Sequence, residues 1–365
     1  MLVVRLSSAT EQDISRVQAV ACEHGELVRT VRLASEAFVL VRSGRPEQEA
    51  LARFTELPRV AAALSLDTPF ILSSRLMTDL STRVVIRPDL EVGGEEFVVM
   101  AGPCAVETDE QVRGTARSVR ESGARVLRGG AFKPRTSPFS FQGHRLAGLE
   151  ILQRAGQEAG LPIVSEVMAT QDLDEVVQSV DILQVGMRNA LNYSLLTAIG
   201  RHPGRPPVLL KRGVGSTLDE LLCAADYVLQ GGNPNVLLCL RGTLNGLGHS
   251  RASLNIADIP ALRRLTHLPI IVDPSHAAGR RDLVPAMSQA ALVAGADGLL
   301  VEVHIKPEEA LVDGPQSLTP HGFASMMQRL RDLSRVMGRT MHSDREPEES
   351  SEPEHPSHTY GNLQV

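Results

Sequence analysis

The stretch FVVMAGPCAVETDEQVRGTARSVRESGARVLRGG, residues 97–130, decides the fold of this chain. It joins a short apolar run at 97–102 to an amphipathic stretch at 108–122 and then to a second apolar run at 125–130. The middle stretch opens on Thr108 and Gln111, whose spacing is a helix-capping pattern. We therefore predict a strand, a helix and a second strand, which is the repeating unit of a parallel sheet.

The same alternation continues to residue 337. Six further apolar runs follow, at 162–167, 181–186, 208–212, 235–240, 269–273 and 298–304. Eight strand–helix units over about 240 residues predict an α/β fold, the (β/α)8 TIM barrel. The runs are apolar almost throughout, which is typical of strands that are covered on both faces.

Two smaller parts flank this barrel, so we expect domains at 1–86, 87–338 and 339–365. Residues 1–86 predict a small α+β domain in the ferredoxin-like order, with a helix after Thr10, a helix at 47–55, and strands near Val60 and Val84 that close the sheet. The tail from about Arg339 is rich in Glu, Pro and Ser, and we expect it to be disordered with solvated histidines.

The composition excludes several classes of protein. The chain has 365 residues and a net charge of −6, whereas nucleic-acid and anionic-membrane binders are usually basic. No apolar run approaches the length of a membrane span, and the N-terminus does not resemble a signal peptide. Four cysteines are too few for a disulfide scaffold, which favours a reducing cytoplasm.

Cationic side chains cluster where the predicted strands end. A barrel of this kind places its active site at the carboxyl ends of its strands. Two of the chain's three lysines lie there. Like charges converge where anions separate them, and phosphate and carboxylate groups match such a set. We therefore predict an anion-binding site formed by Arg128, Lys133, Arg135, Arg188, Lys211 and Arg241.

A second set at the same ends offers one thiol, one imidazole and two carboxylates. Mixed sulfur, nitrogen and oxygen ligands suit a divalent transition metal such as Mn²⁺, Fe²⁺, Co²⁺ or Zn²⁺ better than Ca²⁺ or Mg²⁺. Together with the cations, such a metal indicates chemistry on phosphorylated substrates. Cys223 and Cys239 do not share this placement and are expected to be packing residues. The predicted ligands are Cys104, His276, Glu302 and Asp313.

The motifs that carry these residues resemble a known family, the 3-deoxy-D-arabino-heptulosonate 7-phosphate (DAHP) synthases. The resemblance covers about residues 97–335, and the N-terminal part is similar to the regulatory domain of one branch of the family. The motifs, in order, are AGPCAVE (101–107), RGGAFKPRTSP (128–138), DILQVG (181–186), LKRG (210–213), VDPSH (272–276), VEVH (301–304) and DGPQSL (313–318).

The resemblance implies a reaction, the condensation of phosphoenolpyruvate with erythrose 4-phosphate at the first step of the shikimate pathway. It implies that Arg128 and Lys133 meet the phosphoenolpyruvate carboxylate, while Arg135 and Thr136 bind the aldose phosphate. Lys133 would also move a proton, which an arginine could not do.

The other roles follow from the same resemblance. The phosphate of phosphoenolpyruvate would lie on Arg188, Lys211 and Arg241, and Glu166 would help to place water or an arginine. Cys104 and His276 would take part in catalysis as metal ligands. His304 alternates with Glu302, so a supporting or water-binding role is expected for it.

One segment departs from the family pattern. Residues 243–255 read TLNGLGHSRASLN where the family usually has segments like GIRTF and TRNTLD, and Leu240 stands where this branch often has Glu. This places the pocket for the second substrate in question. The alternatives are a paralogue using another aldose, a 3-deoxy-octulosonate 8-phosphate synthase, and a regulatory barrel without catalysis. Lys133-Pro134-Arg135-Thr136 disfavours the octulosonate enzyme, and the complete ligand set disfavours the regulatory barrel.

The resemblance also indicates the partners. An aromatic amino acid would act as a feedback effector at the N-terminal domain, with a plain oligomerisation domain as the alternative. The family is typically homo-oligomeric, so we expect a tetramer or a dimer.

Overall fold

The N-terminal part is an antiparallel sheet covered by two helices. The computed structural model describes residues 1–33, 35–42, 48–78, 80–244 and 250–342. The strand order is β2-β3-β1-β4, and every pairing is antiparallel, as in the predicted ferredoxin-like unit. Its elements are β1 (Leu2–Ser7), α1 (Glu11–His24), β2 (Glu26–Leu33), β3 (Glu36–Arg42), α2 (Gln48–Thr55) and β4 (Val60–Ser65).

Local sequence explains these elements. Thr10 and Asp13 form a capping box that starts α1, and α1 buries Ile14 and Val17 against the sheet. Along β1, alternate side chains face opposite sides of the sheet. Leu2, Val4 and Leu6 join the cluster under the helices, whereas Val3 belongs to the core that the sheet shares with the barrel.

The strand near Val84 does not close this sheet, so that expectation was wrong. β5 (Val84–Arg87) pairs instead with β6 (Leu90–Val92) in a separate hairpin. β1 already has β3 and β4 as neighbours, and Val84 is buried with the inward-facing residues of the barrel. The hairpin therefore adds apolar side chains to the barrel interior.

The predicted (β/α)8 barrel is confirmed, and all eight expected strands are present. Each strand pairs in parallel with its neighbours, and the order closes on itself as β10-β11-β12-β13-β14-β7-β8-β9. The strands are β7 (Val98–Gly102), β8 (Val126–Arg128), β9 (Ile163–Val167), β10 (Ile182–Val185), β11 (Val208–Lys211), β12 (Val236–Leu240), β13 (Ile270–Val272) and β14 (Gly298–Glu302).

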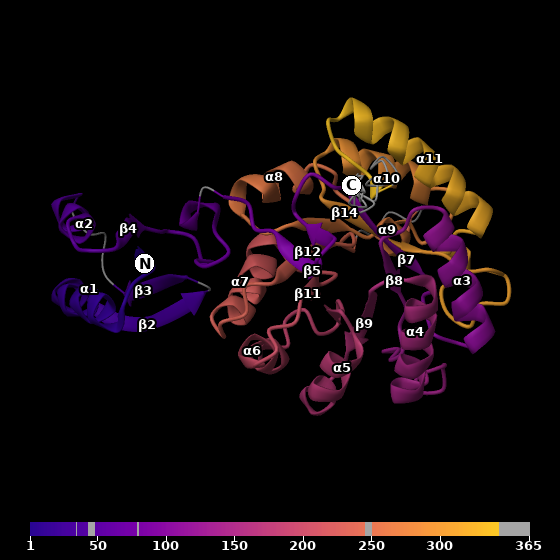
Figure 1. Ribbon diagram of the computed structural model, residues 1–365, viewed down its shortest axis with the longest axis horizontal. Helices are drawn as coiled ribbons and strands as arrows, with labels where there is room; N and C mark the ends of the chain where they lie inside the picture. The colour runs from indigo at the N-terminus through magenta and orange to yellow at the C-terminus, as the bar shows by residue number, and fades with distance from the viewer. Residues whose placement is uncertain (34, 43–47, 79, 245–249, 343–365) are drawn as a thin grey trace, which may run out of the picture.

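Helices surround the strands, with the N-terminal unit to one side of the barrel (Figure 1). Inward and outward residues alternate: Met100 and Leu209 fill the interior, while Val99 and Leu210 pack toward the helices. Both faces of each strand are thus apolar, as predicted. The helices are α3 (Asp109–Glu121), α4 (Arg145–Ala159), α5 (Leu173–Ser179), α6 (Tyr193–Arg201), α7 (Leu218–Leu229), α8 (Asp258–Leu265), α9 (Pro274–Ala278), α10 (Val284–Val293) and α11 (Pro320–Val336).

The segment 71–73 joins the N-terminal unit to the barrel, and we call its contacts with α7 and with residues 266–267 the seam. The Asp226 carboxylate on α7 accepts hydrogen bonds from the backbone N–H groups of Ile71, Leu72 and Ser73, at 2.5, 3.2 and 2.8 Å. Thr266 donates to the Ser73 carbonyl at 2.5 Å. Backbone groups that would be unpaired on burial are therefore satisfied across the two units.

The packed part of the chain extends beyond the predicted boundary at residue 338. Residues 339–342, expected in the disordered tail, lie against the segment before β7, where Phe97 N–H donates to the Thr340 carbonyl at 2.8 Å. Met341 is buried, and His342 lies 3.5 Å from the Arg125 guanidinium rather than free in solvent. The remaining tail, 343–365, lies outside the described residues. Among the residues described, no helix combines the length and apolar character of a membrane span.

Candidate active site

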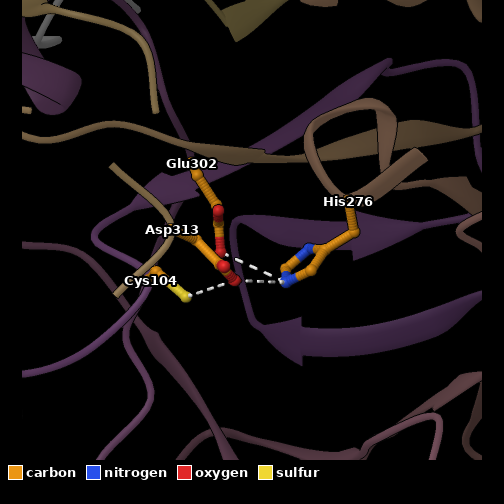
Figure 2. A group of neighbouring side chains, drawn as sticks. All are labelled: Cys104, His276, Glu302 and Asp313. Carbon is orange, nitrogen blue, oxygen red and sulfur yellow. Dashed lines mark hydrogen bonds and ion pairs between the residues drawn. The ribbon is translucent and has the colours of Figure 1, made fainter. Parts of the chain in front are cut away.

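Four side chains converge at the carboxyl end of the barrel, and they are the four predicted metal ligands. Their donor atoms all lie within 4.8 Å of one another (Figure 2). The Asp313 Oδ2 atom is 3.4 Å from Cys104 Sγ and 3.8 Å from His276 Nε2, and Glu302 Oε1 is 3.3 Å from the same nitrogen. Metal–ligand bonds of about 2.0–2.3 Å require donors at such mutual distances.

Four different segments bring these ligands together. Cys104 follows β7, and Glu302 is the last residue of β14. His276 lies in α9, which Asp273 caps by accepting from the His276 N–H at 2.9 Å. Asp313 precedes a short 3-10 helix, η3 (Gly314–Gln316), and its backbone has a left-handed φ of 57°.

Neighbouring side chains orient the candidate ligands. His276 Nδ1 is 2.7 Å from the Asp273 carboxylate, so Nε2 is the nitrogen turned to the cluster. Burial lowers the pKa of His276, which favours the neutral imidazole that a metal requires. Glu302 accepts from Arg128 at 3.0 Å and from Gln316 at 2.6 Å.

The Cys104 thiol is the candidate ligand that would have to lose a proton. Burial raises the pKa of Cys104 to about 12, and the neighbouring Glu302 charge adds to the rise. Lys133 Nζ is 3.1 Å from the sulfur and 2.9 Å from the Cys104 carbonyl oxygen. A bound cation stabilises the thiolate and displaces this proton. One thiolate, one imidazole and two carboxylates, all within reach of one point, fit a divalent transition metal.

One cavity of about 310 Å³ opens beside this cluster. All eight residues predicted to bind substrate line it, together with His276 and Asp313 from the metal set. The expected set is thus in one place, although the role of each member stays a prediction. The eight are Arg128, Lys133, Arg135, Thr136, Glu166, Arg188, Lys211 and Arg241.

Three of these cations lie on the floor of the cavity, where they are almost completely buried. Arg128, Lys211 and Arg241 are each 4% exposed or less. Lys211 pairs with Asp273 at 2.5 Å, and burial lowers the pKa of Arg241. Burying cations is costly unless anions accompany them. The floor therefore favours an anionic ligand.

Glu166 adds a carboxylate to this cationic cavity. Gln184 donates to Oε2 at 3.1 Å, whereas Oε1 is buried and has no hydrogen-bond partner. Burial raises the pKa of Glu166 above its usual value. A side chain at Gly186 would place its Cβ 1.9 Å from Oε1, so glycine is needed for this close approach. This oxygen therefore lacks a hydrogen-bond partner within the described part of the chain.

Sequence reasoning assigned no role to several residues that hold this site. Asp273 had a local signal, because Asp before Pro274 is a helix start. Gln184 and Gln316 lie within the motifs DILQVG and DGPQSL, but neither their local sequence nor that of Arg251 shows which side chains they meet, because those contacts arise only in the fold. His304, for which a supporting or water-binding role was expected, lies beyond the end of the strand, and its Nε2 is 3.5 Å from a Glu107 carboxylate oxygen. It is not among the residues that line the cavity, so that role stays a prediction.

The departing segment borders the site as expected. Thr243 and Ser253 form an antiparallel bridge, which brings Arg251 to the cavity wall, while 245–249 lie outside the described residues. Leu240 is buried at the end of β12. Cys239 is buried in the barrel core, as predicted for a packing residue, and Cys223 packs partly against the core from α7.

Comparison with known proteins assigns the barrel to a family. Residues 81–337 match the model of the DAHP synthetase I family. The chain belongs to this family. It is 40% identical to a phospho-2-dehydro-3-deoxyheptonate aldolase of Thermotoga maritima, over 93% of this chain and 99% of that protein.

Two further comparisons bear on the family. A crystal structure of the Thermotoga maritima DAHP synthase superposes with a TM-score of 0.73 at 37% identity, covering 93% of this chain and 98% of that one. A 2-dehydro-3-deoxyphosphooctonate aldolase of Cyanothece is 28% identical over 68% of this chain and 96% of its own. Identity and coverage are both higher for the heptonate protein.

Proposed function

We propose that this chain condenses phosphoenolpyruvate with erythrose 4-phosphate to give DAHP and inorganic phosphate. The main support for this proposal is that four residues suited to a transition metal lie beside a cavity that contains buried cations. Membership in the DAHP synthetase I family supports the same reaction. Two anionic substrates must be held in contact, and the cations offset their repulsion.

The cavity offers distinct places for the two substrates. Arg128 and Lys133 lie beside the metal ligands and suit the carboxylate of phosphoenolpyruvate. Lys211 and Arg241 on the floor, with Arg188 nearer the rim, suit its phosphate. Arg135 and Thr136 come from the loop after β8 at the open side, where they suit the phosphate of the aldose.

The metal site would be formed by Cys104, His276, Glu302 and Asp313, and Mn²⁺, Fe²⁺, Co²⁺ or Zn²⁺ suits it. A bound ion supplies a Lewis acid that polarises the aldehyde of the second substrate. The chain's own residues do the rest of the work. C3 of phosphoenolpyruvate attacks the aldehyde carbon, water adds at C2, and phosphate leaves from C2.

Two residues are placed to serve these steps. Lys133 has a raised pKa because burial, which would lower it, is outweighed by Cys104 and Glu302. It is therefore an ammonium that can donate a proton to the oxygen formed from the aldehyde. Glu166, whose side chain lines the cavity, orients the water that adds at C2.

The N-terminal unit contributes no described residue to the cavity, whose lining runs from Arg128 to Asp313. We assign it an indirect role, in a homo-oligomer that is a tetramer or a dimer, with an aromatic amino acid as feedback effector. Sedimentation velocity, and rate measurements with added Phe or Tyr, test the two parts separately. We place the chain in the cytoplasm, in keeping with its four free cysteines.

The test follows phosphoenolpyruvate loss after chelator treatment, with Mn²⁺ restored or withheld. Erythrose 4-phosphate and arabinose 5-phosphate are compared as second substrates. Loss that requires both Mn²⁺ and erythrose 4-phosphate supports the proposal. Preference for arabinose 5-phosphate would identify an octulosonate synthase, and loss with neither aldose, despite phosphoenolpyruvate binding, would direct attention to residues 243–255 and another aldose. No loss and no binding would leave a regulatory barrel.

A further inference from the structure

Arg251 lies in the one segment that departs from the family pattern, yet it reaches the metal ligands. Its backbone N–H donates at 3.0 Å to the carbonyl of Ala278, the last residue of α9, and His276 lies in the same helix. Gly279 has a φ of 67°, and a Cβ there would lie 2.5 Å from the Arg251 Cβ. Glycine therefore permits this segment to approach α9 closely.

The Arg251 side chain makes two contacts. Its Nη1 atom is 3.2 Å from Asp313 Oδ1 and 3.0 Å from Gln316 Oε1. The Asp313 oxygen that faces Cys104 and His276 is the other one, Oδ2. The guanidinium thus occupies one carboxylate oxygen and leaves the second directed at the cluster.

The contact with Gln316 extends this arrangement to a second ligand. Gln316 accepts from Arg251 through its oxygen, which fixes the amide so that its nitrogen donates to Glu302 Oε2 at 2.6 Å. Glu302 Oε1 is the atom near His276. One guanidinium therefore holds, directly for Asp313 and through one amide for Glu302, the carboxylate oxygen that does not face His276, while Arg128 contacts Glu302 Oε1.

The ion pairs at the cluster also single out Arg251 as the partner of Asp313. Each acidic ligand has a cation of its own: Lys133 at Cys104, Arg128 at Glu302, and Arg251 at Asp313. Lys133 and Arg128 also line the part of the cavity where the phosphoenolpyruvate carboxylate is proposed. Asp313, in addition, holds an αL backbone conformation that is unfavourable for residues with a Cβ. The ion pair with Arg251 restrains the Asp313 side chain.

We propose that Arg251 is a positioning residue for the metal, orienting Asp313 directly and Glu302 through Gln316. This inference rests on the metal site proposed above. Arg251 acts on the ligands, so its loss changes metal affinity and geometry before any substrate is present. Partners of metal ligands that are removed usually weaken metal binding by about 10–100-fold.

The test titrates metal-free protein with Co²⁺ alone and reads the thiolate-to-cobalt absorption and the visible d–d bands. The variants are Arg251→Gln and Arg251→Lys. Arg280→Gln is the matched control, because Arg280 lines the same neighbouring hollow as Arg251 but pairs with exposed Asp282 instead of the cluster. We expect Arg251→Gln to weaken Co²⁺ binding about 10–100-fold and to alter the d–d bands, with Arg251→Lys in between. Arg280→Gln should match wild type within about twofold.

A second route uses Gln316→Met, alone and combined with Arg251→Gln. Because both residues act on Glu302 along one path, the double variant should lose less than the product of the single losses. Thermal unfolding of the metal-free proteins checks that the variants are folded. Unchanged Co²⁺ affinity and spectra in folded Arg251→Gln would overturn the proposal, as would tighter binding or an equal loss in Arg280→Gln. If the wild-type chain shows no cobalt–thiolate band, the metal site itself fails and this inference fails with it.

Discussion

The mouth of the barrel and the seam both contain buried polar groups, but the two regions differ in whether these groups find partners within the protein. At the seam, one Asp226 carboxylate accepts from three consecutive backbone N–H groups, and Thr266 and His267 bind the backbone of the same segment. At the mouth, Glu166 keeps an unpartnered oxygen, and four ligand atoms face one another.

The difference distinguishes a region that stabilises the structure, the seam, from a region that binds ligands, the mouth. Buried polar groups that find partners within the protein stabilise an arrangement, whereas those left incomplete signal an outside ligand. Changes at the mouth should therefore alter metal binding and catalysis with little effect on folding. Changes at the seam should alter stability with little effect on the chemistry.

The largest effect is expected from Cys104→Ala. Removing the thiolate takes away a ligand and the metal's contribution of several kcal/mol, so the rate should fall roughly a thousandfold or more. Cys239→Ala is the matched control, since Cys239 is equally buried but packs among apolar residues of the barrel interior. Steady-state rates at saturating Mn²⁺ measure both. If the rate of Cys104→Ala stayed within tenfold of the wild-type rate, the thiol would not be a metal ligand.

The next effect is a pH dependence of metal binding. The pKa of Cys104 is raised to about 12, mainly by burial, so the thiol keeps its proton until metal arrives. Nearby cations hold the pKa values of Glu302 and Asp313 low despite burial, and the pKa of His276 is lowered by burial, so these three bring no proton at pH 7.5. One proton should leave per metal.

The measurement is Co²⁺ affinity between pH 7 and pH 9, with proton release from calorimetry in buffers of different ionisation enthalpy. Affinity should rise about tenfold per pH unit, because each binding event releases one proton. A pH-independent affinity would contradict thiolate ligation from a protonated cysteine.

A smaller effect, on stability alone, is expected from Asp226→Asn at the seam. Asparagine has one acceptor oxygen where the carboxylate has two, so buried N–H groups of 71–73 lose a partner. The free energy of unfolding should fall by about 1–3 kcal/mol. Asp219→Asn, on the exposed first turn of α7, should change it by less than about 1 kcal/mol. Denaturant titration measures both, and the rate with saturating substrates should not change. Loss of activity in folded Asp226→Asn would contradict the claim that the seam affects stability without affecting catalysis.

The smallest effect concerns His267 at the seam. Its Nε2 lies 2.9 Å from the Leu72 carbonyl and its Nδ1 lies 2.7 Å from the Thr82 hydroxyl, and burial lowers its pKa below 6.5. The unfolded chain therefore binds this proton more readily, so the stability that His267 contributes is lost as the pH falls from 6.5 toward the folded pKa. The difference in Tm between wild type and His267→Gln should shrink from pH 7.5 to pH 5.5. A constant difference would show that this histidine does not titrate with unfolding.

Much of this comparison could be predicted from the sequence. The barrel follows from the alternation that starts at 97–130, because strand and helix periods are local properties. The metal ligands and the cations follow from the rule that such sites lie after strands. Cys104 and Lys133 were thus predicted as site residues without any knowledge of their contacts.

The remaining features depend on contacts between distant residues. Arg251 and Asp313 lie 62 positions apart and meet only in the fold. The β5–β6 hairpin was misplaced because an apolar strand such as 84–87 suits a sheet edge and a barrel interior equally. Residues 339–342 are polar enough to suggest a tail, yet they pack because the segment before β7 offers its backbone to them.

The most direct test of the central claim is anomalous diffraction from crystals grown with Mn²⁺ and phosphoenolpyruvate. We predict one strong manganese peak between Cys104, His276, Glu302 and Asp313, with phosphoenolpyruvate bound among Arg128, Lys211 and Arg241. A manganese peak elsewhere, or a cluster without metal at saturating Mn²⁺, would contradict the account.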